Sequence, residues 1–291
     1  MDAIITKLNG ETKKLFDLGI KVRDFNVSSI SKRLYSESIQ GRPGAIDLGY
    51  DFETRKITLD VLFTAADSLD FPLLRDEIFY WLGDGEPFYI QEGREPNGVS
   101  FTIGANPNEY YYGKRYLVTT ADAFSFEQTF VYGSGTIELQ TVGLPFAESS
   151  KTTATPMTTD SDGWQFGQGL LLDDEANTYK NDVTSFRIYN AGNVAVNPRF
   201  MPLKITLKNL TGAKARLRNS TTGTSLLIDT AVASGDTITI DGLRVLKNSL
   251  SILRNTDKGL ITLKPGWNQF YIDYVTNTDP HSEFEFRYYY L

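Results

Sequence analysis

The chain has 291 residues, 41% of them hydrophobic and 22% charged, which is enough for two folded domains with ordinary cores. Its net charge of −7 and pI near 4.9 argue against general affinity for nucleic acid, because such affinity needs Lys and Arg to replace counterions. The absence of cysteine excludes disulfides, thiolate metal sites and a cysteine nucleophile.

Targeting and membrane signals are missing from the sequence. The first 19 residues carry charged side chains throughout and no apolar core segment, so no secretory signal is predicted. No stretch approaches about 18 consecutive apolar residues, so no membrane-spanning helix is expected. We therefore expect a protein that is made and folded in a cytosol and has no membrane partner.

Alternation of apolar and polar residues with period two is the dominant pattern. It occurs, in chain order, at residues 57–63, 137–139, 203–207, 238–240, 270–274 and 284–288. Each set places its apolar side chains on one face of a half-buried strand. Pairs of turn-forming residues such as Asn9-Gly10 and Asp241-Gly242 separate the runs. The pattern predicts a mainly β protein.

The segment from Asp67 to Leu82 follows a helical period instead. Pro72 suits the first turn of a helix. Leu74, Ile78 and Leu82 recur every four residues and form one apolar stripe. We expect a single helix here, packed on a sheet through this stripe.

The stretch from Glu92 to Gly113 is too long for an ordinary hairpin turn. We expect an extended arm or β-hairpin between a strand at Phe88–Ile90 and one that begins near Arg115. Neighbouring residues of a strand point to opposite faces, so three consecutive tyrosines cannot all face one core. Because Tyr is enriched at interfaces, the arm is a candidate inter-subunit contact. Its contact residues would be Tyr110, Tyr111 and Tyr112.

Composition shifts in the middle of the chain and suggests where it divides. Residues 147–163 are rich in Ser, Thr and Asp and almost free of bulky apolar residues, as is typical of a linker or domain boundary. We predict an N-terminal domain at residues 1–148, a linker at residues 149–162 and a C-terminal domain at residues 163–291. The first would be a β-sandwich or split barrel with one α-helix, and the second, made of strands only, a β-sandwich.

A search for catalytic patterns finds none. His281, the single histidine, lies in a turn-like stretch, and the adjacent Ser282 is wrongly placed for this histidine to activate it. Ser29 and Lys32 match the S-x-x-K pattern of β-lactamase-like enzymes, but the companion S-D-N and K-T-G motifs are missing. The glycines of residues 133–135 lack the Lys-Ser/Thr of a phosphate-binding loop.

Acidic residues gather around the predicted linker without the spacing of a metal site. Oxygen-rich loops can hold Ca²⁺, but here the D-x-D is not followed by the Gly and the distant Glu of an EF-hand. A solvated acidic surface fits the pattern better. The residues concerned are Asp160, Asp162, Asp173, Asp174 and Glu175. The sequence thus predicts no catalytic residue, no cofactor and no metal ligand.

Two tryptophans of the second half, Trp164 and Trp267, are candidate sugar contacts because aromatic faces stack on sugar rings. The alternative is that both belong to the core of the sandwich. Paired carboxylates for glycoside hydrolysis could also occur among the 36 acidic residues, although sequence does not reveal their separation in space.

The order of several stretches along the chain carries a family resemblance. The first runs from Gly41 to Ala65 and joins a glycine-containing turn to an aromatic residue, an Arg and an alternating strand. The first half continues with LDFPLLRDEIFYWLGDGEPFYI and KRYLVTTADAFSFEQ. The second half contains WQFGQGLLL, FRIYNAGNVAVNPRFMPLKITLKN, LKPGWNQFYI and FEFRYYYL. Together they resemble the distal tail protein family of siphophage baseplates, of the type found in phages of Gram-positive hosts.

This resemblance implies a structural hub subunit rather than an enzyme. The N-terminal domain would assemble into a homohexameric ring below the tail tube, and a galectin-like or carbohydrate-module-like sandwich would lie at its periphery. Implied partners are other copies of the chain, the tail tube protein, a tail-associated protein, and receptor-binding or other baseplate proteins. The ring would leave a lumen through which DNA passes without specific binding. The implied location is the tail tip of the virion, after assembly in the host cytoplasm.

Two other functions remain open. The first is a carbohydrate-binding protein that recognises a bacterial cell-surface glycan, and the second is a glycan-degrading enzyme. Particle size discriminates between them and a hub, because a hub forms rings, alone or with its partners, whereas a free sugar-binding module need not.

Overall fold

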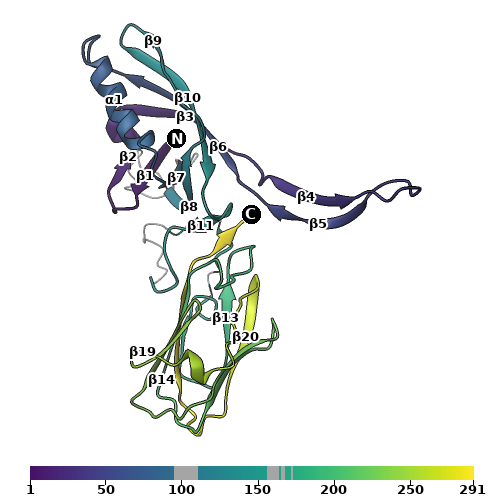
Figure 1. Ribbon diagram of the computed structural model, residues 1–291. Coiled ribbons are helices and arrows are strands. Elements are labelled where there is room, and N and C mark those ends of the chain that lie inside the picture. The colour runs from purple at the N-terminus through teal and green to yellow at the C-terminus, as the bar shows by residue number, and fades with distance from the viewer. Residues whose placement is uncertain (95–110, 156–163, 165–167, 172) are drawn as a thin grey trace. The chain divides into compact units, whose positions relative to one another are not determined.

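The computed structural model describes residues 1–94, 111–155, 164, 168–171 and 173–291 (Figure 1). Contacts divide the chain into two compact units, residues 1–147 with Leu291, and residues 148–290. Strands dominate both units, and within the described residues α1 (Phe71–Leu82) is the single α-helix. The predicted mainly β fold with one helix in the first half is therefore confirmed. No helix in the described part of the chain has the length and hydropathy needed to cross a membrane.

The main sheet of the first unit is antiparallel, in the order β2-β1-β7-β8-β10-β6-β3, and β9 pairs with β10. Strands β4 and β5 form a separate two-stranded ribbon. The elements are β1 (Asp2–Lys7), β2 (Thr12–Lys14), η1 (Phe16–Leu18), β3 (Ile20–Val27), β4 (Lys32–Glu37), β5 (Ile46–Phe52), β6 (Lys56–Thr64), α1, β7 (Phe88–Arg94), β8 (Tyr111–Thr120), β9 (Glu127–Thr129) and β10 (Tyr132–Thr141).

Strand β6 contributes a continuous row of buried side chains to the core of this unit. It lies between β10 and β3 and pairs with both over most of its length. Its alternate residues are buried on one face, as the period of two predicts: Ile57, Leu59, Val61 and Phe63. On β3 the register shifts between Val22 and Asp24, and this bulge returns Phe25 to the buried face.

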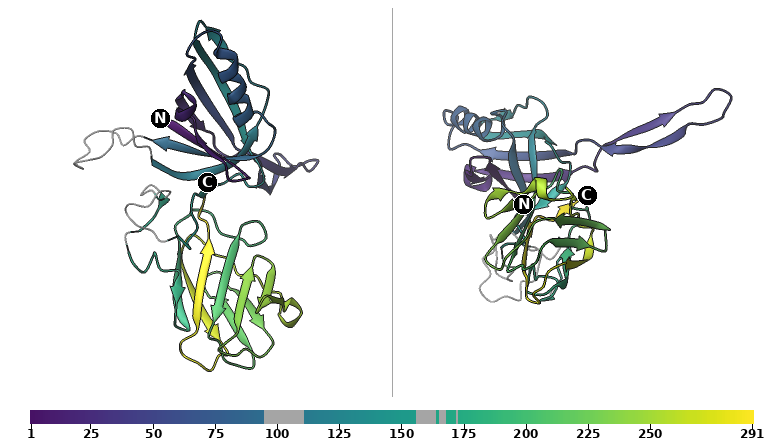
Figure 2. Two further views of the ribbon diagram at one scale, coloured as in Figure 1. Left: turned by 90° about the vertical axis from the view of Figure 1, so that its left-hand side faces the viewer. Right: turned by 60° about the horizontal axis from the view of Figure 1, so that its bottom comes forward.

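Helix α1 lies along one face of the sheet and packs on it through aromatic rings (Figure 2). The ring of Phe63 on β6 lies 5.3 Å from Phe71 of the helix and 5.0 Å from Phe126. Phe79 of the helix stacks on Phe126 at 5.8 Å. Gly133 of β10 makes room for these rings, because a Cβ at that position would come within 2.2 Å of the Phe63 ring.

The buried stripe of α1 differs from the expected one at a single position. Ile78 and Leu82 are fully buried, as predicted. Leu74 is only half buried, and Phe71 takes the inward position instead. Phe71 lies about two turns before Ile78 on the same side of the helix, and its ring contacts Phe63 of the sheet.

The second unit is a sandwich of two antiparallel sheets, ordered β12-β21-β14-β17-β18-β19 and β13-β20-β15-β16. Rings from the two sheets meet in the core: Phe284 lies 4.8 Å from Phe270 and 5.8 Å from Phe186. The predicted β-sandwich is confirmed. The elements are β11 (Ala147–Ser149), β12 (Lys180–Asn181), β13 (Ser185–Asn190), β14 (Leu203–Lys208), β15 (Ala215–Asn219), β16 (Thr224–Ile228), β17 (Thr237–Asp241), β18 (Arg244–Lys247), β19 (Leu250–Ser251), η3 (Leu253–Asn255), β20 (Gly266–Asp273), β21 (His281–Phe286) and β22 (Tyr289–Tyr290).

Part of the predicted linker is folded rather than exposed. The backbone N–H of Ser149 donates to the carbonyl of Tyr288 at 2.9 Å, and that of Thr153 to the carbonyl of Phe286 at 3.0 Å. Both side chains are buried, and their hydroxyls are hydrogen-bonded. Thr153 Oγ1 donates to the carbonyl of Phe284 at 2.8 Å, and Ser149 Oγ accepts from the backbone N–H of Tyr288 at 3.1 Å. Residues 156–163 of the predicted linker lie outside the described residues.

The helix face can be tested with two substitutions in one helix. Ile78→Asp should lower the stability of the first unit by several kcal/mol, because an unpaired charge would enter the core. Leu73→Asp is the control, since Leu73 is 69% exposed. Thermal unfolding followed by circular dichroism should show a large loss for the first variant and little change for the second. Equal unfolding midpoints would contradict the packing described here.

Candidate assembly surface

In the described part of the chain, strands β4 and β5 form a ribbon of two strands. They pair from Lys32–Phe52 to Glu37–Ile46, and the ribbon extends away from the main sheet of its own unit (Figure 1). It continues the β3–β6 pair, because backbone hydrogen bonds join Ser31 to both Glu53 and Thr54. Nearly all of its residues are exposed. An isolated two-stranded hairpin is only marginally stable in water, so the ribbon lacks a layer that would stabilise it.

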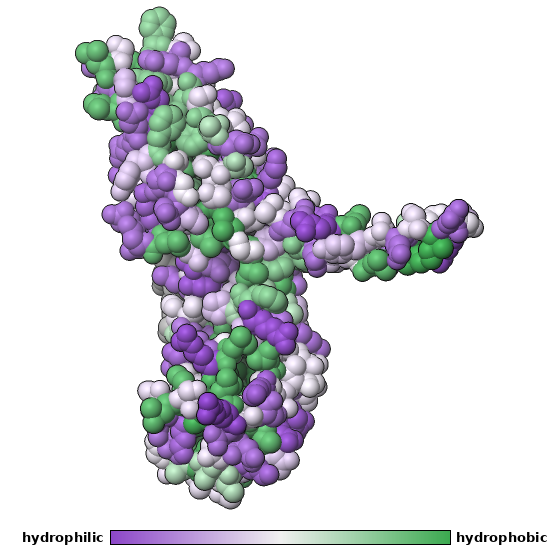
Figure 3. Space-filling view, viewed as in Figure 1, coloured by the Kyte–Doolittle hydropathy of each residue, from purple (hydrophilic) through white to green (hydrophobic). Residues whose placement is uncertain are grey.

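One face of the ribbon is apolar. Leu34 pairs with Tyr50 and Lys32 with Phe52, and directly opposite residues share a face. The rings of Tyr50 and Phe52 meet edge to face at 5.4 Å, and the Lys32 ammonium lies 4.5 Å from the centre of the Tyr50 ring. Leu34 is 71% exposed. In the space-filling view, hydrophobic residues are visible along the ribbon (Figure 3).

The opposite face is polar and makes its own contacts. The guanidinium of Arg33 lies 2.7 Å from the carboxylate of Glu53. The hydroxyl of Tyr35 donates to the carboxylate of Asp51 at 2.9 Å. The ribbon is therefore amphipathic. Its polar side chains pair with one another, and its apolar face is exposed at Leu34 and Tyr50, while Phe52 packs on Phe146 of the same unit at 5.7 Å.

A β-bulge shapes the ribbon near its tip. Tyr35 faces Gly49 and Ser36 faces Asp47, so Leu48 is an extra residue without a cross-strand partner, and it is 60% exposed. Gly49 has a φ of 99°, which favours glycine, and its N–H donates to the Asp47 carboxylate at 2.8 Å. A bulge of this kind bends and twists the strand that carries it.

The predicted tyrosine contact falls only partly within the described residues. Strand β7 runs to Arg94 and β8 begins at Tyr111, so both strands enter the stretch expected to form an arm. Tyr111 pairs with Arg94 and Tyr112 with Gly93, which places the backbone of both tyrosines in the sheet. Tyr110 and the rest of residues 95–110 lie outside the described residues. The contact through these tyrosines stays a prediction.

The two candidate sugar-binding tryptophans have different surroundings. The Trp164 ring lies 5.7 Å from that of Tyr288, and its indole N–H is buried without a hydrogen-bond partner in the described part of the chain. Trp267 lies 5.1 Å from Tyr189, with the Arg187 guanidinium 4.5 Å from its ring. These contacts do not join the indoles into one platform. Their role in sugar binding stays a prediction.

The remaining polar candidates form ordinary surface contacts. His281 Nδ1 lies 2.5 Å from the carboxylate of Asp182, while the side chain of Ser282 is buried. Glu175 pairs with Arg187 at 2.6 Å. Within the described residues, no group of three or more acidic or His side chains could hold a metal ion. Two members of the predicted acidic cluster, Asp160 and Asp162, lie outside those residues.

The ribbon was missed in the sequence, although two signals for it are present. Ile46, Leu48, Tyr50 and Phe52 alternate with polar residues or glycine, and the turn-forming Gly-Arg-Pro-Gly of residues 41–44 precedes them. Such a pattern indicates a hairpin. It does not indicate solvent on both faces, because alternation ordinarily marks a strand with one face buried.

One protein-family model and three solved structures illustrate what this chain is similar to. A protein-family model for the phage tail protein RIFT-related domain matches residues 8–141. The Dit (gp 19.1) protein of phage SPP1, described as a paradigm of the hub adsorption apparatus in phages infecting Gram-positive hosts, has a TM-score of 0.61 at 14% identity, over 98% of this chain and 99% of that chain. The chain therefore shares the fold of that protein.

Two structures of the phage p2 baseplate in its activated conformation are more distant. The one with Sr has a TM-score of 0.39 at 8% identity, over 98% of this chain and 97% of that chain. The one with Ca has a TM-score of 0.39 at 7% identity, over 99% and 97%. A comparison with curated proteins found no match.

The bulge offers a test of the ribbon itself. Gly49→Ala should loosen the ribbon without unfolding the unit, because a Cβ at this φ costs roughly 1–3 kcal/mol. Hydrogen exchange of residues 46–52 should then be about tenfold faster or more. Ser36→Ala, on the facing strand, is the control and should leave exchange nearly unchanged. Identical exchange in both variants would contradict the strained position of Gly49.

Proposed function

We propose, on the premise that this chain is a phage tail structural protein whose residues 8–141 belong to the RIFT-related domain family, that it is the hub subunit of a tail tip. Six copies would form a ring that joins the tail tube to tail-associated and receptor-binding proteins. The ring would leave a lumen for DNA, and the subunit would reside at the tail tip after assembly in the host cytoplasm. The number of copies and the lumen rest on the sequence resemblance to distal tail proteins.

The observation that carries this proposal is the apolar face of the β4–β5 ribbon. Leu34 and Tyr50 present exposed aliphatic and aromatic surface on the ribbon, and Phe52 beside them packs edge to face on Phe146 of the same unit at 5.7 Å. Exposed apolar surface of this kind marks an interaction site. The continuous backbone pairing between β3–β6 and β4–β5 fixes the ribbon in direction, so it can reach a surface outside its own domain.

A neighbouring copy of the chain is the partner that this geometry suits best. A projecting ribbon meets a surface different from itself, so the contact between two copies is head to tail. A head-to-tail contact repeats from copy to copy and closes into a ring when the rotation allows. The ribbon also has two open edges, which can add backbone hydrogen bonds to the contact.

The charge of the chain fits a channel for DNA. A net charge of −7 gives no general attraction for phosphate, so DNA could pass a ring of such subunits without adhering to it. The acidic balance thus supports passage rather than binding.

Carbohydrate recognition is the alternative function, and Trp267 is the observation in its favour. Its ring lies beside Tyr189 and Arg187 on the opposite face of β20 from the buried Phe270. Binding of the protein to a bacterial cell-surface glycan, lost in a Trp267→Ala variant, would favour this alternative over a purely structural role.

Ring formation can be tested on the apolar face directly. Leu34→Asp combined with Tyr50→Asp should leave the protein monomeric with an unchanged circular dichroism spectrum, because the contact surface would become charged. The parent should form rings, alone or with its tail partners, visible in negative-stain images and by light scattering. Tyr35→Ser with Asp51→Ser, on the polar face, should form rings like the parent. Equal ring formation by the charged variant would overturn the role of the ribbon.

The same measurement addresses the predicted tyrosine contact. Deletion of Asn97 to Asn108 should prevent ring closure if the segment that leads to Tyr110 reaches a neighbouring subunit. Rings that form as readily as those of the parent would exclude that segment while leaving the ribbon as the contact.

A further inference from the structure

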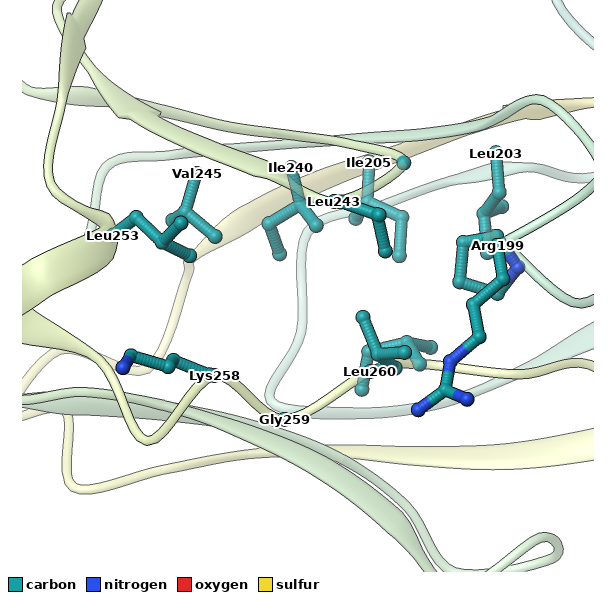
Figure 4. A pocket seen from close by; sticks show the side chains of 13 residues that line it. Arg199, Leu203, Ile205, Ile240, Leu243, Val245, Leu253, Lys258, Gly259 and Leu260 are labelled. Atoms are coloured by element: carbon teal, nitrogen blue, oxygen red, sulfur yellow. The ribbon is translucent and has the colours of Figure 1, made fainter.

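A pocket of about 270 Å³ opens in the second unit, remote in sequence from the ribbon. One wall is a row of aliphatic side chains from three neighbouring strands of one sheet. The facing wall is the chain segment Lys258–Leu260, which follows η3 (Figure 4). The side chains of the row are Leu203, Ile205, Ile240 and Val245. The pocket therefore reaches the buried aliphatic layer of the sandwich from its surface.

Two cations flank this apolar slot. Arg199 and Lys258 both line the pocket and are exposed. Among the described residues, neither side chain forms an ion pair. The carboxylate beside Lys258, that of Asp257, instead accepts the backbone N–H groups of Leu227 and Gly259 at 3.0 and 2.9 Å. Positive charge thus stands uncompensated at the edge of the pocket in a chain whose net charge is −7.

An exposed apolar side chain lies at the edge of the pocket. Leu243, at the turn between β17 and β18, lines the pocket and is 54% exposed. An occupant can therefore gain apolar contact outside the slot as well as within it.

The chemistry of the walls limits what can bind. No aromatic ring lines the pocket, so a sugar ring would find no stacking surface. The volume lies just below the roughly 300–1,000 Å³ typical of small-molecule sites and is large enough to admit an apolar side chain of a partner. The flanking cations favour carboxylates beside that side chain, and charge complementarity of this kind orients and selects partners.

We propose that this pocket docks an acidic segment of a partner protein, which inserts one Leu-like side chain into the slot and places carboxylates near Arg199 and Lys258. Ring formation through the ribbon is not required for this docking, so the two proposals can fail separately. The aliphatic walls give affinity, and the two cations give selectivity for acidic partners.

The test uses the full chain with labelled Ile, Leu and Val methyl groups and three acetylated heptapeptides. The first has a central Leu flanked by Asp residues, the second replaces that Leu by Ala, and the third replaces the Asp residues by Lys. The first peptide should shift the methyl signals of Ile205, Ile240 and Val245 and should bind more weakly as salt is added. The other two should bind about tenfold more weakly or worse.

Charge-reversed variants locate the contact. Arg199→Glu combined with Lys258→Glu should weaken binding of the first peptide by about tenfold or more. Both side chains are exposed, so the unfolding midpoint should stay close to that of the parent. Lys208→Glu with Lys214→Glu is the matched control, because it changes the net charge equally at exposed positions of the same unit that do not line the pocket.

Three results would overturn the proposal. The first is no methyl shift with the Leu peptide at millimolar concentration. The second is equal binding of the Leu and Ala peptides, or undiminished binding by the Arg199 and Lys258 variant. The third is a shift of the same methyl groups by octanoate alone, without any by the peptide, which would assign the pocket to a small amphiphile instead.

Discussion

The β4–β5 ribbon cannot bury its own surface. It has two faces and two edges, and two strands alone provide no layer that could cover them. On the polar face, side chains pair locally, Arg33 with Glu53 and Tyr35 with Asp51. On the apolar face, Phe52 packs on Phe146 of the same unit, whereas Leu34 and Tyr50 stay exposed. The ribbon continues the β3–β6 pair of the main sheet, since β3 leads into β4 and β5 leads into β6, and backbone hydrogen bonds join the two pairs.

The core of the first unit could be foreseen only in part from sequence. Period-two alternation identified β6 and its buried face, and a helical period identified α1. The sequence did not reveal that Phe71, and not Leu74, takes the inward position on the helix, because that position depends on a ring contact with Phe63 on another element. Gly133 shows the same limit. In the sequence it was considered only as part of a phosphate-binding loop and rejected, because the Lys-Ser/Thr is missing. In the structure it accommodates the Phe63 ring, which lies on the neighbouring strand.

Surfaces were harder to foresee than strands, for a physical reason. Alternation reports which side chains share a face, whereas the fate of that face depends on whether another layer covers it. The alternation at residues 46–52 therefore does not reveal that both faces of the ribbon are exposed. In the linker, Ser149 and Thr153 suggested exposure by composition, yet their hydroxyls complete hydrogen bonds to the last strands of the chain. The pocket in the sandwich joins residues from three strands and a distant loop, so no local pattern marks it.

The bulge at Leu48 also bears on what happens before assembly. An unassembled subunit presents open strand edges, and long flat edges are templates for aggregation. Leu48 interrupts the regular spacing of backbone donors and acceptors along that edge. A strand of another molecule therefore cannot form a continuous hydrogen-bonded ladder along its whole length. The bulge thus opposes the growth of fibres by edge-to-edge pairing. Productive association then depends on complementary side chains rather than on backbone hydrogen bonds at an open edge.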